Sequence, residues 1–218
     1  IGRTVIALRV VAVVTTLGAA SMVLASFSED RALRVDARDP AAAAVLHRRA
    51  TRLAPFESAY ERASGFAFEQ AAVAGADRPS TKQAIADAID AYERALDAQP
   101  NNVGYLVDLA RVHLLRAQRI DPRGYEESAH WWEAALARDQ FDWELHELYA
   151  LTLNEWANRS GDIDIRRRAA TEFATVVEFH PAHSPGWLNL ARTQIALGEF
   201  DAARLSIAAA RWNPTAND

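Results

Sequence analysis

One recurring spacing of residues constrains the fold of this chain more than any other feature. Ala88, Tyr92 and Ala95 stand 12, 8 and 5 residues before Pro100. In a helix these offsets place the three side chains on one stripe. The small residues let a neighbouring helix approach, the ring fills the space between them, and the proline ends the helix. A recurring triplet of this kind predicts an array of paired helices.

The small–large–small triplet returns four more times before a helix-ending position. The other copies are Ala43, His47 and Ala50 before Pro55; Ser128, Trp132 and Ala135 before Gln140; Ala169, Phe173 and Val176 before Pro181; and Ala203, Ile207 and Ala210, with Pro214 one residue early.

The helices that follow the stops share a second pattern of apolar and small residues. No proline interrupts a helical pattern and no segment alternates like a β-strand, so the sequence predicts an all-α protein. The second pattern consists of Leu106, Leu109, Ala110 and His113; then His146, Tyr149, Ala150 and Leu153; then Trp187, Leu190 and Ala191.

Together the two patterns resemble the tetratricopeptide repeat (TPR) family, whose 34-residue helix–turn–helix unit carries W-x2-L-G-x2-Y and A-x3-F-x2-A…P. Gly65 and Gly198 also match positions where the family favours glycine. The resemblance implies a TPR-like right-handed α-solenoid of about four helix pairs plus an extra helix over residues 40–214, followed by a tail at 215–218.

An uncharged run precedes the repeats. Residues 10–27 contain 18 consecutive residues without a charge. At about 1.5 Å per residue they reach about 27 Å, close to the thickness of the bilayer core. A signal-peptide core is usually shorter. We therefore expect a single membrane anchor over residues 1–27, with the following residues facing lipid: Val10, Val14, Leu17, Met22 and Leu24.

The anchor is followed by a charged segment over residues 28–39, which we expect to be a helical stalk or linker; as a stalk it can complete the first helix pair. Arginines flank the run on both sides, so the positive-inside rule does not fix its orientation. We expect a single-pass protein of a bacterial inner membrane, with membrane lipid as one partner and the repeat domain on the periplasmic side.

The charge of the chain argues against one class of partner. The chain has 218 residues, no cysteine and a net charge of −5. After residue 27 the balance is 22 − 29 = −7, because only Arg3 and Arg9 precede that point. This acidity argues against nucleic acid as the main partner.

The TPR resemblance implies that the first helices of the pairs line a concave face. Arginines on that face can hold carboxylates bidentately. Val107 and Glu147 stand where carboxylate-clamping family members carry basic or asparagine residues, so we do not expect a chaperone-type clamp. The alternative is a solvated face with no ligand. The predicted partner-binding residues are Arg62, Phe66, Arg111, Glu147, Leu148, Asn154, Asn189 and Arg192.

The last helix offers a second candidate surface. Leu205, Ala208 and Trp212 have little polar cover, so either the chain continues or this end contacts a partner or lipid. Trp131 is either a core residue or an interface residue.

No constellation of catalytic residues emerges. His146 and Glu147 lack the second histidine of a zinc protease, and Asp162 and Asp164 fit helix capping better than calcium binding. There is no nucleophile elbow, P-loop or dinucleotide motif. We expect no catalytic, cofactor-binding or metal site, and no enzyme activity.

Three functions compete. The first is a membrane-anchored scaffold or docking subunit that mediates protein–protein interaction in a larger membrane or envelope complex. The second rests on a resemblance of the apolar run and HRRATRLAPFE to the C-terminal TPR tail of O-antigen ligase- and polymerase-like membrane proteins, and implies a regulatory tail of a glycan-handling enzyme. A third is an adaptor that binds a lipid surface.

Overall fold

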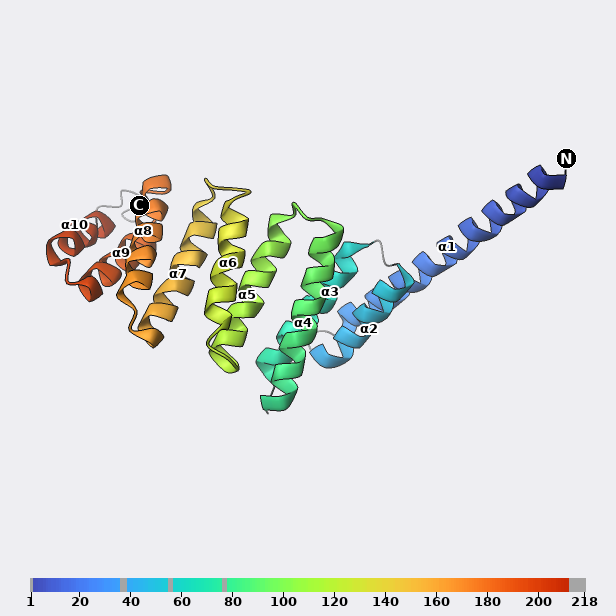
Figure 1. Cartoon of the computed structure of the whole chain (residues 1–218), viewed down its shortest axis with the longest axis horizontal. Helices are drawn as coiled ribbons and strands as arrows, with labels where there is room; N and C mark the ends of the chain where they lie inside the picture. Colours follow the sequence, from blue (N-terminus) through green and yellow to red (C-terminus); the bar gives the residue numbers. More distant parts are fainter. Residues whose placement is uncertain (1, 36–38, 55–56, 76–77, 212–218) are drawn as a thin grey trace. The chain divides into compact units, whose positions relative to one another are not determined.

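The computed structural model describes the backbone of residues 2–35, 39–54, 57–75 and 78–211, and the side chains of residues 19–35, 39–54, 57–75 and 79–211. These residues form ten helices and no strand (Figure 1). The helices are α1 Gly2–Val35, α2 Pro40–Leu53, α3 Ser58–Ala74, α4 Arg78–Ala98, α5 Val103–Arg119, α6 Gly124–Leu136, α7 Trp143–Ser160, α8 Ile163–Phe179, α9 Ser184–Leu197 and α10 Phe200–Arg211.

The chain divides into two compact units, and the boundary falls inside α5. Unit 1 is Ile1–Val112 and unit 2 is His113–Asp218. In unit 1, α1 pairs with α2 and α3 with α4; in unit 2, α7 pairs with α8 and α9 with α10. The extra helix predicted at the start of the repeats is therefore paired.

The first pair corrects the predicted membrane anchor. Across the residues whose side chains the structure describes, none of the helices is both long enough and apolar enough to span a lipid bilayer. The predicted transmembrane helix and the single-pass inner-membrane localisation are therefore wrong. Met22 and Leu24 are half exposed, whereas Val10, Val14 and Leu17 lie outside the described side chains.

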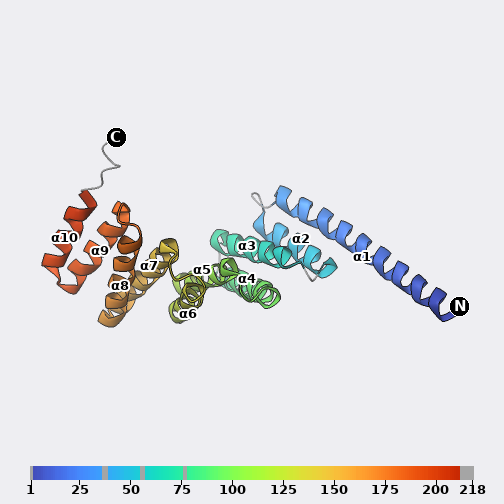
Figure 2. The same cartoon turned by 90° about the horizontal axis from the view of Figure 1, so that it is seen from above.

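The described half of α1 packs on α2 instead. Figures 1 and 2 both show α2 beside the C-terminal part of α1. Ala25 and Ala32 are fully buried in α1, and Ala25 lies in one cluster with Ala50 of α2. Glu29 Oε2 lies 2.5 Å from His47 Nδ1. In the described part of the apolar run Ala25 is buried, whereas Met22, Leu24 and Phe27 are exposed, so of these four residues only the small one is buried against α2. α1 continues without a break through residue 27. The predicted domain boundaries at 27, 39 and 214 stay predictions.

The small–large–small triplets form the core of both units. In unit 1, Ala88, Tyr92 and Ala95 are fully buried. Tyr92 packs against Gly65, where an added Cβ would meet the ring at 2.6 Å. In unit 2, Trp132 and Phe173 occupy the same place in α6 and α8, with exposed fractions of 1% and 0%.

Aspartate side chains cap the start of α2, α7 and α8. The Asp39, Asp142 and Asp162 side chains each accept hydrogen bonds from the first turn of the helix that follows. Asp121 does not cap α6; its carboxylate accepts from Arg123 N, and the helix begins at Gly124. α7 and α9 end at Gly161 and Gly198, whose positive φ angles suit glycine.

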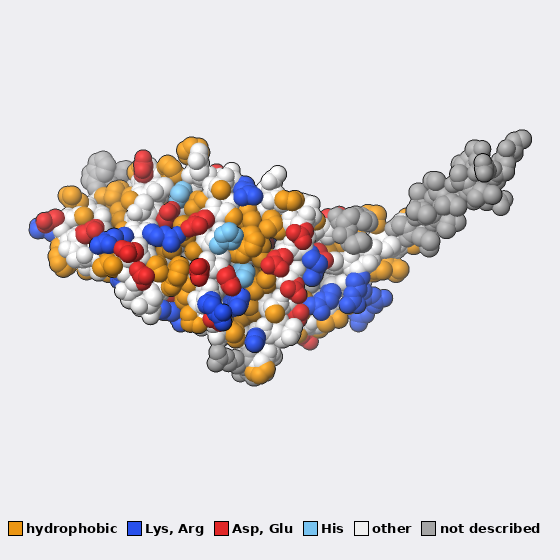
Figure 3. Space-filling model, in the orientation of Figure 1, with side chains coloured by type: hydrophobic (Ala, Val, Ile, Leu, Met, Phe, Trp, Pro, Cys, Tyr) orange, Lys and Arg blue, Asp and Glu red, His pale blue; other side chains and the backbone are white. Residues whose placement is uncertain are grey.

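Charge is distributed unevenly along unit 1. Figure 3 shows basic side chains gathered near the α1/α2 pair and acidic ones spread over the helices that follow. The exposed arginines of this pair are Arg31, Arg34, Arg49 and Arg52.

Candidate functional site

The first helices α3, α5, α7 and α9 each carry one small residue at an equivalent place: Gly65, Ala110, Ala150 and Ala191. We define the first-helix face as the residues three before, one after and four after each small residue. On a helix these offsets fall on one side. The members are Arg62, Phe66 and Glu69; Val107, Arg111 and Leu114; Glu147, Leu151 and Asn154; and Leu188, Arg192 and Ile195.

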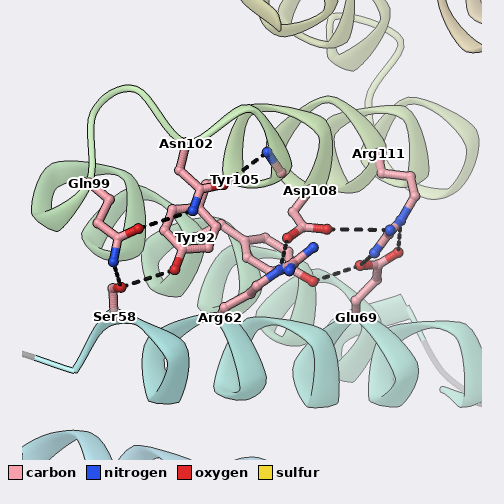
Figure 4. A network of polar contacts seen from close by, with 10 residues as sticks. Ser58, Arg62, Glu69, Tyr92, Gln99, Asn102, Tyr105, Asp108 and Arg111 are labelled. Atoms are coloured by element: carbon pink, nitrogen blue, oxygen red, sulfur yellow. Dashed lines mark hydrogen bonds and ion pairs between the residues drawn. The ribbon is translucent and has the colours of Figure 1, made fainter. Parts of the chain in front are cut away.

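In unit 1 this face is held by a polar network between α3 and α5 (Figure 4). Arg62 Nε donates to Asp108 Oδ2 at 2.5 Å. Arg111 donates two hydrogen bonds to Glu69, from Nε to Oε1 at 3.0 Å and from Nη2 to Oε2 at 2.6 Å. Tyr92 of α4 donates its hydroxyl to the same carboxylate at 2.9 Å. Glu69 thus satisfies three donors from two neighbouring helices.

A second part of the network fixes the turn between α4 and α5. Gln99 Nε2 donates to Ser58 Oγ at 2.8 Å. Ser58 Oγ also lies 3.0 Å from the Tyr105 hydroxyl, and Asn102 Nδ2 donates to Gln99 Oε1 at 3.1 Å. The start of α3 is therefore tied to the start of α5 without any charged group.

The carboxylates of the network are buried, while the guanidinium groups reach solvent. Glu69 and Asp108 are 8% and 3% exposed, whereas the Arg62 and Arg111 side chains are about half exposed. The hydrogen bond that Arg62 donates to Asp108 raises the pKa of Arg62, and the bonds that Arg111 donates to Glu69 raise the pKa of Arg111. Burial, and next to it the Glu69 charge, raises the pKa of the Tyr92 hydroxyl. The two arginine shifts keep the guanidinium groups charged, and the Tyr92 shift keeps its hydroxyl protonated and able to donate.

The sequence analysis expected Arg62 and Arg111 to offer their charge to a partner. The structure pairs both with carboxylates of the same chain, so the charge of this part of the face is balanced internally. Phe66 occupies the same place in α3 as Arg111 in α5, and it is 44% exposed. A partner of unit 1 would meet this ring and the outer edges of two neutralised guanidinium groups. Whether these residues bind a partner stays a prediction.

On α7 and α9 of unit 2, three of the six members of the first-helix face are apolar and exposed. Leu151, Leu188 and Ile195 are 42%, 41% and 47% exposed. Leu148, one residue beyond the face as defined, is 42% exposed. α7 and α9 lie together there, because Ala150 and Leu190 belong to one buried cluster.

The polar residues predicted to bind a partner in unit 2 differ in whether they already contact another side chain of the chain. Glu147 Oε1 lies 2.8 Å from His183 Nε2, so its carboxylate serves the junction with α9. Asn154 and Asn189 are half-buried, and Arg192 is exposed.

Sequence reasoning missed four residues of this region. Glu69 and Asp108 are charged residues that the repeat pattern does not mark as buried. Leu151 and Ile195 were overlooked, although counting from Ala150 and Ala191 would have placed them with Phe66 and Asn154. Repeat register was the available signal for the two apolar residues.

The predicted C-terminal surface is partly described. Leu205 is 74% exposed and Ala208 is exposed on α10, whereas Trp212 lies outside the described residues. Trp131 is half-buried. The binding role of this surface stays a prediction.

Nothing in the described part of the chain groups three or more metal-ligating side chains. Instead, four histidines each face one glutamate: His47 with Glu29, His113 with Glu127, His146 with Glu172 and His183 with Glu147. The predicted absence of enzyme activity stays a prediction.

No family model and no curated protein matches the chain. Solved structures match its fold. A crystal structure of MamA protein aligns with a TM-score of 0.64 and 10% identity, over 86% of this chain and 90% of that one. MamA 41-end from Desulfovibrio magneticus RS-1 aligns with a TM-score of 0.64 and 13% identity, over 89% and 97%.

A third match decides the class of fold. YrrB, described as a TPR protein with an unusual peptide-binding site, aligns with a TM-score of 0.58 and 17% identity, over 87% of this chain and 86% of that one. The chain has a TPR-like fold. At these identities the likeness extends to the fold alone, and the resemblance to O-antigen ligase tails stays a prediction.

Proposed function

We propose that this TPR-like chain is a protein-interaction scaffold whose first-helix face in unit 2 binds an apolar peptide segment of a partner. The observation that carries the proposal is the set of exposed apolar side chains on two adjacent first helices, Leu148 and Leu151 on α7 with Leu188 and Ile195 on α9. Exposed apolar side chains gathered on one face mark interaction surfaces in soluble domains.

The chemistry around these side chains defines the segment further. Glu147 is engaged by His183, which leaves Arg192 as the exposed charge of the face. A segment with two or three apolar side chains and an acidic residue in register with Arg192 fits this arrangement. The printed description of YrrB as peptide-binding supports this use of the fold. We further propose that the chain acts as a docking subunit of a larger complex.

The test is selection from a displayed random-peptide library with the whole chain, followed by affinity measurement of the selected peptides. Replacing both Leu151→Asp and Leu188→Asp should weaken binding at least about tenfold, since hot-spot truncations cost more than about 1 kcal/mol each. The matched control is Ile163→Asp, an exposed apolar residue at the start of α8 that lies outside this face. Peptides that bind the double variant as tightly as the unaltered chain would refute the proposal.

A further inference from the structure

Unit 2 carries a pocket that the first-helix face does not use. It is formed by the second helices α6 and α8, with Tyr149 contributed by α7, and has a volume of about 390 Å³. Its lining residues are Glu133, Leu136, Ala137, Tyr149, Arg168, Thr171 and Glu172.

Hydrogen bonds fix the polar groups on the α6 side of this pocket. The Tyr149 hydroxyl donates to Glu133 Oε1 at 2.7 Å, and Arg168 Nη2 donates to the same oxygen at 2.6 Å. Arg168 also donates to the Tyr149 oxygen. Tyr149 is buried, so the phenol and the guanidinium hold the Glu133 carboxylate in place through one of its two oxygens.

On the α8 side the second carboxylate is held in the same way, by one oxygen. Glu172 Oε2 lies 2.7 Å from His146 Nδ1, whose other nitrogen lies 3.1 Å from the Gln140 carbonyl oxygen. In the part of the chain that the structure describes, Glu133 Oε2 and Glu172 Oε1 accept no hydrogen bond. Because both glutamates line the pocket, each can offer its second oxygen to a further donor.

The charges of the lining select a cation. Two carboxylates and one guanidinium line the pocket, so acidic groups outnumber basic ones in its lining. An anion would meet two carboxylates, and a wholly apolar group would strip them of water without replacing it. Leu136 and Ala137 supply an apolar wall beside them.

We propose that this pocket takes an arginine or lysine side chain presented by a partner protein. The unbranched apolar stem of such a side chain lies along Leu136 and Ala137 while its charged head reaches the free oxygens of Glu133 and Glu172. A volume near the lower end of ligand sites, about 300–1,000 Å³, suits one long side chain. The proposal stands apart from the first-helix face, since none of the residues that define that face lines the pocket.

The experiment is an NMR titration of the ¹⁵N-labelled chain with two blocked amino acids, N-acetyl-arginine methylamide and N-acetyl-norleucine methylamide. The two probes share an unbranched apolar stem, but only the first carries a guanidinium. We expect the arginine probe to shift the amide signals of residues 133–137, 149 and 168–172, and the norleucine probe to leave them unchanged. Raising the salt concentration should weaken the arginine effect, because screening reduces the attraction of partly exposed charges.

Three variants locate the effect. Glu133→Gln or Glu172→Gln should each weaken binding of the arginine probe about threefold, as expected for one partly exposed charge pair. Glu178→Gln, an exposed residue of the same helix α8 outside the pocket, should leave it unchanged. Because glutamine keeps an acceptor for Tyr149 and His146, these variants should fold, and their amide spectra check this directly.

The outcomes separate cleanly. Shifts at the named residues that respond to Glu133→Gln and Glu172→Gln but not to Glu178→Gln support the proposal. Shifts elsewhere, equal shifts with norleucine, or equal weakening by Glu178→Gln would overturn it. Peptide binding at Leu151 and Leu188 is measured separately, so failure of one proposal leaves the other standing or falling on its own data.

Discussion

Units 1 and 2 use the same helix positions for opposite chemistry. Four residues after the small residue, unit 1 carries Glu69, a buried carboxylate that binds Arg111 and Tyr92, whereas the last first helix of unit 2 carries the exposed Ile195. One residue after the small residue, Arg111 in unit 1 is hydrogen-bonded to Glu69, whereas Leu151 in unit 2 is exposed. A repeat fold therefore fixes where a side chain lies, while its chemistry decides whether the position serves the chain itself or is left for a partner.

The largest expected effect is on the internally bonded face. Glu69→Ala removes the acceptor of three hydrogen bonds. It leaves the buried Tyr92 hydroxyl without this acceptor and Arg111 with only its ion pair to Asp108, Nη1 to Oδ1 at 3.4 Å. We expect the free energy of unfolding to fall by about 3 kcal/mol. Urea denaturation followed by circular dichroism measures the loss. Tryptophan fluorescence shows whether it spreads, since all six tryptophans lie after residue 112.

The control for this substitution is Glu93→Ala. Glu93 is exposed on α4. Partial desolvation of its carboxylate, together with the nearby charges of Asp90 and Asp97, raises its pKa. Its removal should leave stability unchanged or slightly increased. Equal losses for Glu69→Ala and Glu93→Ala would show that the network contributes nothing specific.

A smaller effect is expected at the small position itself. Gly65→Ala places a Cβ at 2.6 Å from the Tyr92 ring, which must then move. We expect a loss of about 2 kcal/mol from overpacking. The equivalent residue in α7 is Ala150, where the reverse substitution Ala150→Gly should cost about 1 kcal/mol through helix propensity. Thermal denaturation of both variants checks the order, and a Gly65→Ala chain as stable as the unaltered one would contradict the close packing.

The smallest effect concerns the pH dependence of stability that the buried His113 of unit 2 causes. Burial lowers the pKa of His113 from its ordinary value of about 6.5, and outweighs the attraction of Glu127. Because the unfolded chain then binds this proton more readily than the folded chain, stability is fully present above pH 6.5 or so and falls as the pH drops toward the folded-state pKa.

His113→Gln removes the titrating group and keeps a donor for Glu127. Stability curves measured from pH 8 to pH 5 should therefore be flatter for this variant than for the unaltered chain. A variant with an equally steep curve would show that His113 is not the group responsible.

The sequence predicted the packing well and the polar contacts poorly. Tyr92, Trp132 and Phe173 could be located because each is a large residue between small ones at a fixed helical spacing, and all three are buried. The bond between Arg111 and Glu69 could not, since it joins residues 42 positions apart whose contact depends on how neighbouring pairs stack.

The first helix shows a different limit. Within the described part of the apolar run of α1, Ala25 is buried but Met22, Leu24 and Phe27 are exposed, so the apolar composition of the run does not predict which of its residues are covered. Which surface covers an apolar helix depends on the shapes of the surfaces that meet, whereas an apolar run in the sequence indicates only hydrophobicity.

The close seam between α1 and α2 has a mechanical consequence. Alanines at the contact bring the two backbones near each other, and the Glu29–His47 pair pins the helices at one point along their length. A pull on α1 would therefore load α2 in shear along a continuous interface. The first pair would transmit force to α2 as a stiff lever, with little slack to absorb it.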